Sequence, residues 1–574
     1  MRKYHHSVKP GIIVLFWLGI LLAAAGNSFA QKAARKDIKG FIKDAWSGEA
    51  LPFANVFIKG TNYGSATNTD GYFVIVNAPV GPCSLTVYYI GYISKVIGLN
   101  NKSEGIPALQ IKLEPTVLSG EGVVVTANRE MLEASTKEVS QVTISPRQLS
   151  SLPSIGEVDV FRSIQLLPGI SAASEGESGL YVRGGTPDQN LILFDGMTIY
   201  HVDHFFGFFS AFNADAIKDI QVFKGGFPAQ YGGRISSVVN LTGKSGDMNN
   251  LRFGMGANLL SANAYVEIPL FDKGTFLLAA RRSYTDFIRS PLYDSIYKLM
   301  TGEESGSVGP GVRGGMQFGG MQQAEFQPAF YFYDLNSKLT LFPSMKDVLT
   351  VSFYSGKDDL DKSQDYSGME FRFPGSEEGA ALETKDFTRW GNLGSSGKWS
   401  RQWNNRLHTD MLVAYSKYFS TYDRSTSMEG QSLPNDSTAR RRGFGFASVQ
   451  DNDIKDMTFR MDTDWHVSPS HTLRLGTWIS QFDSRYTATM NDTITFFSRT
   501  GRAWQYAAYF QDRWKIKSLE LTLGLRASQY EKTQRMYYEP RASSIYHVNS
   551  NLRLKGAWGY YYQLVNLFVN ENVT

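Results

Sequence analysis

The chain has 574 residues, a formal net charge of +4 and one cysteine, Cys83. The first 30 residues hold Arg2, Lys3 and Lys9 but no acidic residue, and without them the charge is +1. A net charge this close to zero excludes the large basic field that nucleic-acid binding needs. A single cysteine excludes an intrachain disulfide and zinc sites with two or four cysteines. With 54 glycines, 20 prolines and 13% aromatic residues, the composition favours turn-rich β-structure over disorder.

An export signal is predicted at the N-terminus. Basic residues precede the apolar run Gly11–Ala25, which is 15 residues long. A membrane-spanning helix needs about 20 apolar residues, so this run is too short. Ser28-Phe29-Ala30 has the small-x-small pattern of a cleavage site. We therefore predict a secretory signal peptide over residues 1–30, and expect any membrane-spanning part to be a β-barrel.

Residues 38–115 alternate short apolar segments with turn signals. Strand-like segments include 72–76 and 84–89, and Thr69-Asp70-Gly71 is one of the turns between them. About seven strands in this length predict a β-sandwich. The stretch resembles the carboxypeptidase-regulatory-like domain, which implies a transthyretin-type fold without peptidase activity. A structural module is the preferred interpretation, and a docking surface for a periplasmic partner is the alternative.

Residues 119–129 form a linker with a strand-forming centre. That centre consists of Val123, Val124, Val125, Thr126 and Ala127. Valine runs favour strands, and an isolated strand offers unpaired backbone groups with which another protein can pair. The segment resembles the TonB box, through which TonB-dependent outer-membrane transporters engage their energy transducer. The alternative is an ordinary strand of a neighbouring domain.

Region 130–245 carries a series of motifs in a defined order. Residues 161–170 predict a helix that ends at Pro168-Gly169. Val-Arg-Gly-Gly, Asp-Gly, Asp-x-Ile…Lys-Gly and Tyr-Gly-Gly-Arg then follow, and this series resembles the plug domain of TonB-dependent transporters. Lys224 and Gly226 stand where such plugs often have Arg and Pro. The resemblance implies structural roles for Arg183, Gly184, Asp195, Gly196, Lys224, Gly225, Tyr231 and Gly232.

Two groups of plug residues have alternative interpretations. For Arg183, Asp195 and Lys224 we favour structural charge pairing over substrate contact, and Asp195-Gly196 is typical of a hairpin turn. The next polar and aromatic side chains could line a ligand site at the outer apex of the plug, or pack against a barrel wall. These candidate ligand contacts are Tyr200, His201, His204, Phe205 and Phe206. No metal site is predicted, although His201, Asp203 and His204 offer ligand-type side chains.

Residues 250–574 show roughly thirteen segments of alternating polarity, each about 9–15 residues, as transmembrane strands should be. Short turns are expected near 343–344, 404–405, 469–470, 517–518 and 549–550. Long polar connections are expected at about 287–329, 357–385, 420–455 and 484–501. Regular alternation of short and long connections is typical of an outer-membrane barrel.

The number of strands predicts an incomplete barrel. Plugged transporters use about 22 strands, whereas roughly thirteen are counted, and an open sheet edge is not tolerated in a bilayer. We therefore expect the N-terminal portion of a longer protein. The fold class is mainly β: a transthyretin-like β-sandwich, an α+β plug domain and an incomplete antiparallel transmembrane β-barrel.

The resemblance implies TonB-dependent import of a scarce substrate: an iron complex, a cobalamin-like molecule, a peptide or a glycan. It implies an outer-membrane protein with a periplasmic N-terminal domain, with the TonB-type transducer and membrane lipid as partners. No enzymatic activity is expected, because no nucleophile elbow or zinc-protease motif is present. No cofactor is expected, because the resemblance implies that the inner-membrane proton gradient supplies the energy. The alternatives are a signalling or adhesion receptor that binds without import, and a SusC-like glycan importer.

Overall fold

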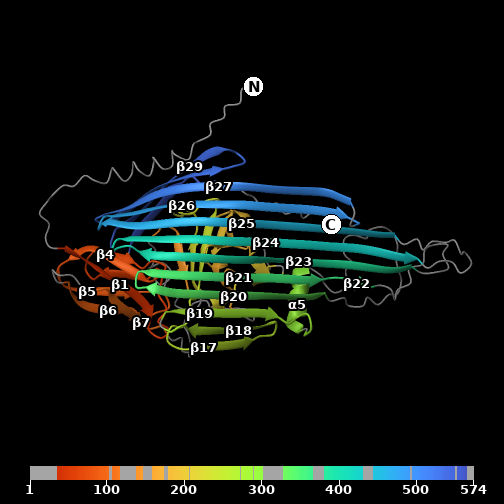
Figure 1. The fold of residues 1–574 in the computed structure, drawn as a ribbon, viewed down its shortest axis with the longest axis horizontal. Helices are drawn as coiled ribbons and strands as arrows, with labels where there is room; N and C mark the ends of the chain where they lie inside the picture. The colour runs from red at the N-terminus through yellow and green to blue at the C-terminus, as the bar shows by residue number, and fades with distance from the viewer. Residues whose placement is uncertain are drawn as a thin grey trace, which may run out of the picture.

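The structure is a computed structural model. It describes residues 35–61, 63–101, 107–116, 138–145, 158–172, 179–205, 207–271, 273–288, 290–301, 328–365, 380–430, 444–491, 494–549 and 552–564. Figure 1 shows a small sandwich at one end of a broad curved sheet, with the plug behind that sheet. Within the described part, no helix is long and apolar enough to cross a membrane.

The sandwich consists of seven strands in two sheets, as predicted. One sheet has the order β4 (Tyr72–Pro79), β1 (Arg35–Asp44), β7 (Leu109–Leu113). The other has the order β3 (Gly64–Ala66), β2 (Asn55–Ile58), β5 (Gly81–Tyr88), β6 (Lys95–Asn101). Alternate residues of β1 are buried, and Ile38 and Ile42 pack in the core with Val56, Leu85 and Ile111. This alternation forms a single apolar core between the sheets.

The plug is built on a five-stranded mixed sheet. Its order is β12 (Met197–Thr198), β11 (Asn190–Phe194), β16 (Ser237–Gly243), β15 (Ile217–Phe223), β8 (Gln141–Ile144). Helix α4 (Val160–Gln165) packs on this sheet, and Asp159 caps it by accepting a hydrogen bond from the Arg162 N–H at 2.8 Å. A helix is thus present in the predicted segment, but it ends at Gln165, before Pro168-Gly169.

The described part of the plug also contains two short strand pairs and two 3₁₀ turns. β9 (Ile170–Ser171) pairs with β10 (Tyr181–Val182), and β13 (Asp203–His204) pairs with β14 (Phe209–Ser210). The 3₁₀ turns are η1 (Pro187–Gln189) and η2 (Ala214–Ala216).

The third body is one large antiparallel sheet, called here the wall. It has fourteen strands: β17 (Arg252–Ala257), β18 (Ser261–Pro269), β19 (Gly274–Ser283), β20 (Ala329–Ser344), β21 (Asp347–Asp361), β22 (Gln364–Asp365), β23 (Ala380–Gln402), β24 (Leu407–Gly430), β25 (Phe444–Ser468), β26 (His471–Met490), β27 (Ile494–Ile516), β28 (Leu519–Tyr530), β29 (Arg535–His547) and β30 (Arg553–Gly559). Each strand pairs with the next in chain order, except that β21 pairs with β23 and the short β22 pairs only with β23. In the described residues β17 and β30 are edge strands, so the sheet is not closed. The predicted mainly-β fold class, with a plug and an incomplete barrel, is confirmed.

The five short turns are found where they were predicted, but the regular alternation of short and long connections is wrong for the last strands: only residues 491–493 join β26 to β27, and only residues 531–534 join β28 to β29. The five expected turns link β20 to β21, β23 to β24, β25 to β26, β27 to β28 and β29 to β30, and all lie at one end of the wall, called here the short-turn end. The opposite, long-loop end includes helix α5 (Pro291–Thr301). The sandwich lies at the short-turn end, at the left of Figure 1.

The predicted strand lengths of about 9–15 residues are wrong for the middle of the wall. Strands β23 to β27 have 20 to 25 residues each and extend into three of the segments predicted as long connections. The prediction relied on an apolar face. Beyond the apolar zone both faces of a strand can be polar, although the backbone ladder continues, so the sequence pattern ends before the strand does.

The two faces of the wall have opposite polarity. On β21, Leu349 and Val351 are exposed, whereas Ser352, Tyr354 and Asp358 on the other face are buried against the plug. The wall therefore presents polar residues to its interior and apolar residues to the outside, as the alternation of 349–354 predicts. This is the reverse of a soluble sandwich.

Candidate functional site

The turn Asp195-Gly196 anchors the plug to the wall. It joins β11 to β12 with positive φ at both residues (46° and 85°), as a two-residue hairpin turn of this hand requires. Asp195 Oδ1 lies 2.9 Å from Lys338 Nζ, and its Oδ2 accepts a hydrogen bond from Ser352 at 2.8 Å. Burial alone would raise the pKa of Asp195, but Lys338 and hydrogen bonds from Gly243 and Ser352 hold that pKa below its usual value.

Gly196 is needed at this turn for two physical reasons. Its φ of 85° strains any L side chain, and a Cβ here would lie 2.3 Å from Leu412 Cδ2 of the wall. We expect Gly196→Ala to destabilise the plug by about 1–3 kcal/mol in urea unfolding followed by pulse proteolysis. Gly184→Ala is the matched control, because Gly184 has φ 83° and open space around its Cβ. Equal losses for both variants would contradict a contribution from Leu412.

His204 lies in a second buried contact between plug and wall. Its Nδ1 is 2.8 Å from Asp358 Oδ1, its Nε2 is 2.9 Å from Asp334 Oδ1, and its side chain is 3% exposed. Arg281 pairs with the same Asp334 and donates a hydrogen bond to the Ser210 carbonyl oxygen at 2.7 Å. Burial opposes the imidazolium form, but the two carboxylates outweigh it and raise the pKa of His204 to about 10. Two anions and two cations therefore balance in this cluster.

The other candidate ligand contacts fall into two groups. Phe205 is buried against Tyr293 and Phe330, so Phe205 and His204 pack against the wall, which is the alternative given above. Tyr200 and His201 are partly exposed. Tyr200 donates a hydrogen bond to Asp456 Oδ2 at 2.6 Å, and His201 Nε2 lies 3.2 Å from Asp203 Oδ1. Phe206 lies outside the described residues. Ligand contact stays a prediction.

The Tyr-Gly-Gly-Arg loop lies against the last wall strands. Arg541 donates hydrogen bonds to the carbonyl oxygens of Pro228 (2.6 Å) and Tyr231 (2.8 Å), and the fully buried Arg526 donates to that of Gln230 (3.2 Å). A Cβ at Gly232 would lie 2.4 Å from Arg526 Nε. The glycine therefore lets the plug backbone approach a buried guanidinium.

The remaining predicted structural residues make contacts within the plug. Lys224 donates a hydrogen bond to the Pro168 carbonyl oxygen at 3.0 Å. Arg183 is exposed and donates a hydrogen bond to Ser140 Oγ at 3.2 Å, and the charge pairing expected for it stays a prediction. Gly184 and Gly225 have φ of 83° and 76° and form the tight turns beside these residues. The strand-forming centre 123–127 lies outside the described residues.

Sequence reasoning missed the partners that the wall supplies. Lys338, Asp334, Asp358, Arg281, Arg526 and Glu539 are all buried and all lie on the interior face. On β20 the charged residues Asp334 and Lys338 alternate with residues of the opposite, apolar face. They therefore lie on the same face of the strand as Asn336 and Thr340. Charged residues at inward-facing positions of alternating strands are the signal that could have identified them.

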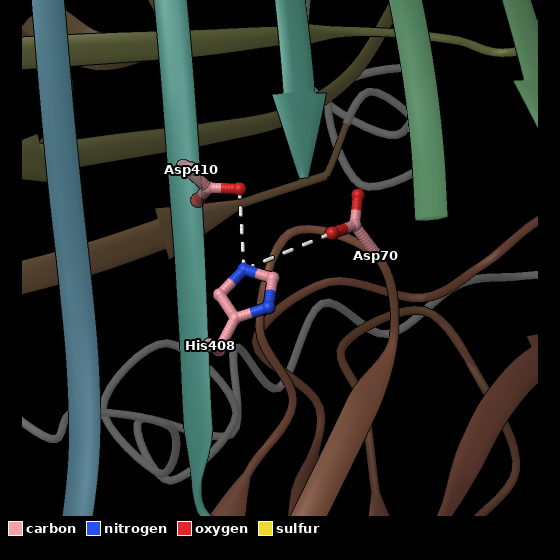
Figure 2. Close-up of side chains that lie close together, drawn as sticks. All are labelled: Asp70, His408 and Asp410. Carbon is pink, nitrogen blue, oxygen red and sulfur yellow. Dashed lines mark hydrogen bonds and ion pairs between the residues drawn. The ribbon is translucent and has the colours of Figure 1, made fainter. Parts of the chain in front are cut away.

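One cluster outside the plug has the proximity expected of metal ligands. The ligand atoms of Asp70, His408 and Asp410 lie within 4.8 Å of one another. Figure 2 shows the imidazole between the carboxylate of Asp410 on its own strand and that of Asp70 on a sandwich loop. The Lys398 ammonium already lies 3.6 Å from Asp70 Oδ1, and the ring is within hydrogen-bond distance of Asp410, so positive charge is supplied by the protein. The cluster is an ion-pair contact between sandwich and wall.

Comparison with known families assigns the three bodies. Residues 38–125 match the CarboxypepD_reg-like domain, residues 134–239 the TonB-dependent receptor plug domain, and residues 332–571 the TonB-dependent receptor-like β-barrel. The curated relatives include TonB-dependent receptor P3 of Formosa agariphila, which is 23% identical over 48% of this chain and 27% of the relative. TonB-dependent receptor P26 of the same organism is 26% identical over 39% of this chain and 22% of the relative. The matched part of the chain thus spans about a quarter of these relatives' length.

Solved structures to which this chain is similar include two receptors and one transporter. A ferric enterobactin receptor of Pseudomonas aeruginosa has a TM-score of 0.48 at 15% identity, over 76% of this chain and 64% of that one. The siderophore receptor PirA of Acinetobacter baumannii gives 0.48 at 15%, over 75% and 62%. The outer membrane transporter YddB of Escherichia coli gives 0.48 at 12%, over 74% and 61%. Because the sandwich, the plug and the barrel profiles match in this order along the chain, it belongs to the TonB-dependent receptors.

Proposed function

We propose that this chain acts in TonB-dependent import across the outer membrane. The observation that carries the proposal is a separate plug domain inside a wall whose interior is polar and whose exterior is apolar. An apolar exterior suits lipid. A polar interior suits a removable plug, because water can replace its hydrogen bonds and ion pairs when the plug moves.

The connection lengths support one orientation of the protein. Outer-membrane barrels place short turns in the periplasm and long loops outside. The sandwich would then lie in the periplasm. The plug residues 200–209 would lie toward the outside, because their partners Phe330 and Phe332 are near the long-loop end of β20. Tyr200 and His201, which are partly exposed, are the plug residues best placed to meet a substrate from the outside.

The proposed mechanism starts with the strand-forming segment 123–127. The transducer pairs with its backbone and pulls, and energy comes from the inner-membrane proton gradient without a nucleotide or cofactor. Force applied between the sandwich and β8 reaches the plug sheet, whose contacts with the wall at Asp195 and His204 are polar and can be exchanged for water. A path then opens for a substrate that is an iron complex, a cobalamin-like molecule, a peptide or a glycan.

The first test is binding of the transducer. Because pairing relies on backbone N–H groups, Val124→Pro removes a donor and fixes φ, so we expect it to abolish binding of the purified periplasmic domain of the transducer, measured by calorimetry. Val124→Ala is the matched control, and we expect it to bind within about threefold of wild type because its backbone donor is intact. Unchanged binding by Val124→Pro would contradict the assignment of residues 123–127 as the transducer contact.

Growth distinguishes import from signalling or adhesion. A strain that lacks this gene is grown on each of the four substrate classes as the sole source of iron, cobalamin, nitrogen or carbon. A defect that wild type repairs and Val124→Pro does not supports energised import of that class. Repair by both proteins contradicts TonB-dependent import and favours a receptor that binds without it.

A further inference from the structure

The sandwich docks on the plug and the wall through charges of opposite sign. Its contacts use three carboxylates, and each one meets a cation of the plug or wall. The three contacts, called here joints, are Asp37 with Arg406, Glu49 with Lys218, and Asp70 with Lys398 and His408. In each of these ion pairs the sandwich supplies the carboxylate and the plug or wall supplies the cation, although His408 also lies 3.1 Å from Asp410 of the wall.

The first joint is a two-bond contact with a wall turn. Arg406 lies in the turn between β23 and β24 and donates to Asp37 through Nε (2.8 Å to Oδ2) and Nη2 (2.9 Å to Oδ1). The same Nη2 donates to Asn77 Oδ1 at 3.1 Å. Beside it, Lys39 Nζ donates to Asn405 Oδ1 at 2.9 Å. A fork on a carboxylate fixes orientation as well as position.

The second joint reaches the plug. Lys218, at the start of β15, lies 3.1 Å from Glu49 Oε1, and their side chains are only 9% and 13% exposed. The same Oε1 accepts a hydrogen bond from the Ser245 N–H at 2.5 Å. Burial lowers the pKa of Lys218, and Glu49 opposes that shift. Without Glu49, the ammonium would be left in a dry site with one carboxylate fewer.

The third joint joins Asp70 of the sandwich to two wall cations, and Figure 2 shows one of them, His408, beside Asp70. The other is Lys398, whose Nζ donates to Thr69 Oγ1 at 3.0 Å and lies 3.6 Å from Asp70 Oδ1. His408 Nε2 lies 3.9 Å from the other oxygen of Asp70. The turn that carries Thr69 and Asp70 is therefore held by two neighbouring wall strands, β23 and β24.

The three joints place the sandwich across the boundary between plug and wall. One joint holds the plug sheet and two hold the wall, so the plug cannot leave at the short-turn end while all three persist. A cavity of about 280 Å³ lies behind the sandwich, lined by sandwich, plug and wall residues that include Glu49, Gln221, Thr340 and Lys398. The sandwich thus covers an internal space on the side from which the plug would be pulled.

We propose that the sandwich is a charge-latched lid over the short-turn end of the plug, and that it must be released before the plug can open a path. The need for release rests on the proposed transport function, whereas the closed position of the lid does not. A pull on the linker, which follows the sandwich and precedes the plug in the sequence, would act on the sandwich and on these joints as well as on the plug. Because the joints are separate ion pairs, they can break one after another. Each break exposes charges that water can solvate.

The lid is tested on the full-length protein in native outer membranes, opened so that reagent reaches both faces. Cys83→Ser removes the cysteine of this sequence, and Thr340→Cys reports on the cavity, since Thr340 is 3% exposed and lines it. The probe is a maleimide attached to a 5-kDa polyethylene glycol, a size class far above the space in the cavity. Met345→Cys, at an exposed wall turn, gives the labelling rate of an open site.

The latch variants exchange the charges of the first joint. We expect Asp37→Arg and Arg406→Asp each to raise the labelling rate of Thr340→Cys about tenfold, because like charges replace a two-bond ion pair. The double variant, which carries the pair in reverse, should return the rate to within about twofold of the starting protein. Arg401→Asp is the control, because Arg401 pairs with Asp347 inside the wall at the same end. It should leave the rate unchanged.

Three results would overturn the proposal: labelling of Thr340→Cys as fast as Met345→Cys with the latch intact, unchanged labelling after either single reversal, or no recovery in the double variant. Thr350→Cys, a second cavity-lining position, replaces Thr340→Cys if that protein does not fold. The assay contains neither transducer nor substrate. A labelling result that contradicts the lid therefore does not contradict the transport proposal. Conversely, evidence that import does not depend on the transducer does not contradict the closed position of the lid.

Discussion

Replacement of Asp195 by alanine is expected to destabilise the docking of the plug in the wall by about 3–5 kcal/mol, because Lys338 would be left buried without its partner. The carboxylate is bonded to Lys338 (2.9 Å), to Ser352 (2.8 Å) and to the Gly243 N–H (3.0 Å). The measurement is the midpoint of plug unfolding in urea, followed by pulse proteolysis of the full-length protein in its membrane.

Two further variants separate the charge from the hydrogen bonds. Asp195→Asn keeps an acceptor and tolerates the positive φ, so its loss should be smaller than that of Asp195→Ala. Combining Asp195→Ala with Lys338→Met removes the unpaired charge and should recover most of the loss. A double variant that is no more stable than Asp195→Ala would contradict the buried ion pair. Because the pKa of Asp195 is lowered in the folded state, its contribution is present above about pH 4 and is lost as the pH falls through the lowered pKa.

The sequence was sufficient for features that depend on local chemistry. The turn at Asp195-Gly196 follows from residues that tolerate positive φ, and the helix ends before Pro168-Gly169. The five short wall turns were placed where a pair of polar residues, or proline followed by serine, interrupts the alternating segments. In each case the signal lies within a few residues of the feature that it specifies.

Features set by contacts distant in sequence were not predictable in this way. Nothing local distinguishes Lys338 from the other inward polar residues of β20, and its pairing with Asp195 depends on where the plug sits in the wall. The same holds for Arg406, whose partner Asp37 is 369 positions away in the sequence. The long strands were missed because their outer halves lack an apolar face while keeping the backbone ladder.

His204 gives the second large effect, and it depends on pH. The imidazolium lies between Asp334 and Asp358. His204→Ala removes this cation from both buried carboxylates, and Asp334 keeps its ion pair with Arg281. We expect a loss of about 3–5 kcal/mol in the same urea assay. Replacement by glutamine keeps a donor nitrogen on one side only and carries no charge, so it should recover only part of that loss.

The sign of the pH dependence follows from the raised pKa of His204. The contribution of the imidazolium is fully present below the unfolded value of about 6.5 and is lost as the pH rises through about 10. The urea midpoint of the wild-type plug should therefore fall between pH 7 and pH 10, and His204→Gln should flatten that fall. His471→Gln is the control: His471 also pairs with an aspartate, Asp512 at 3.0 Å, but its side chain is 44% exposed, so water screens the pair. If His471→Gln flattened the profile as much as His204→Gln, or if His204→Gln kept the wild-type slope, the buried imidazolium would not be what holds this end of the plug.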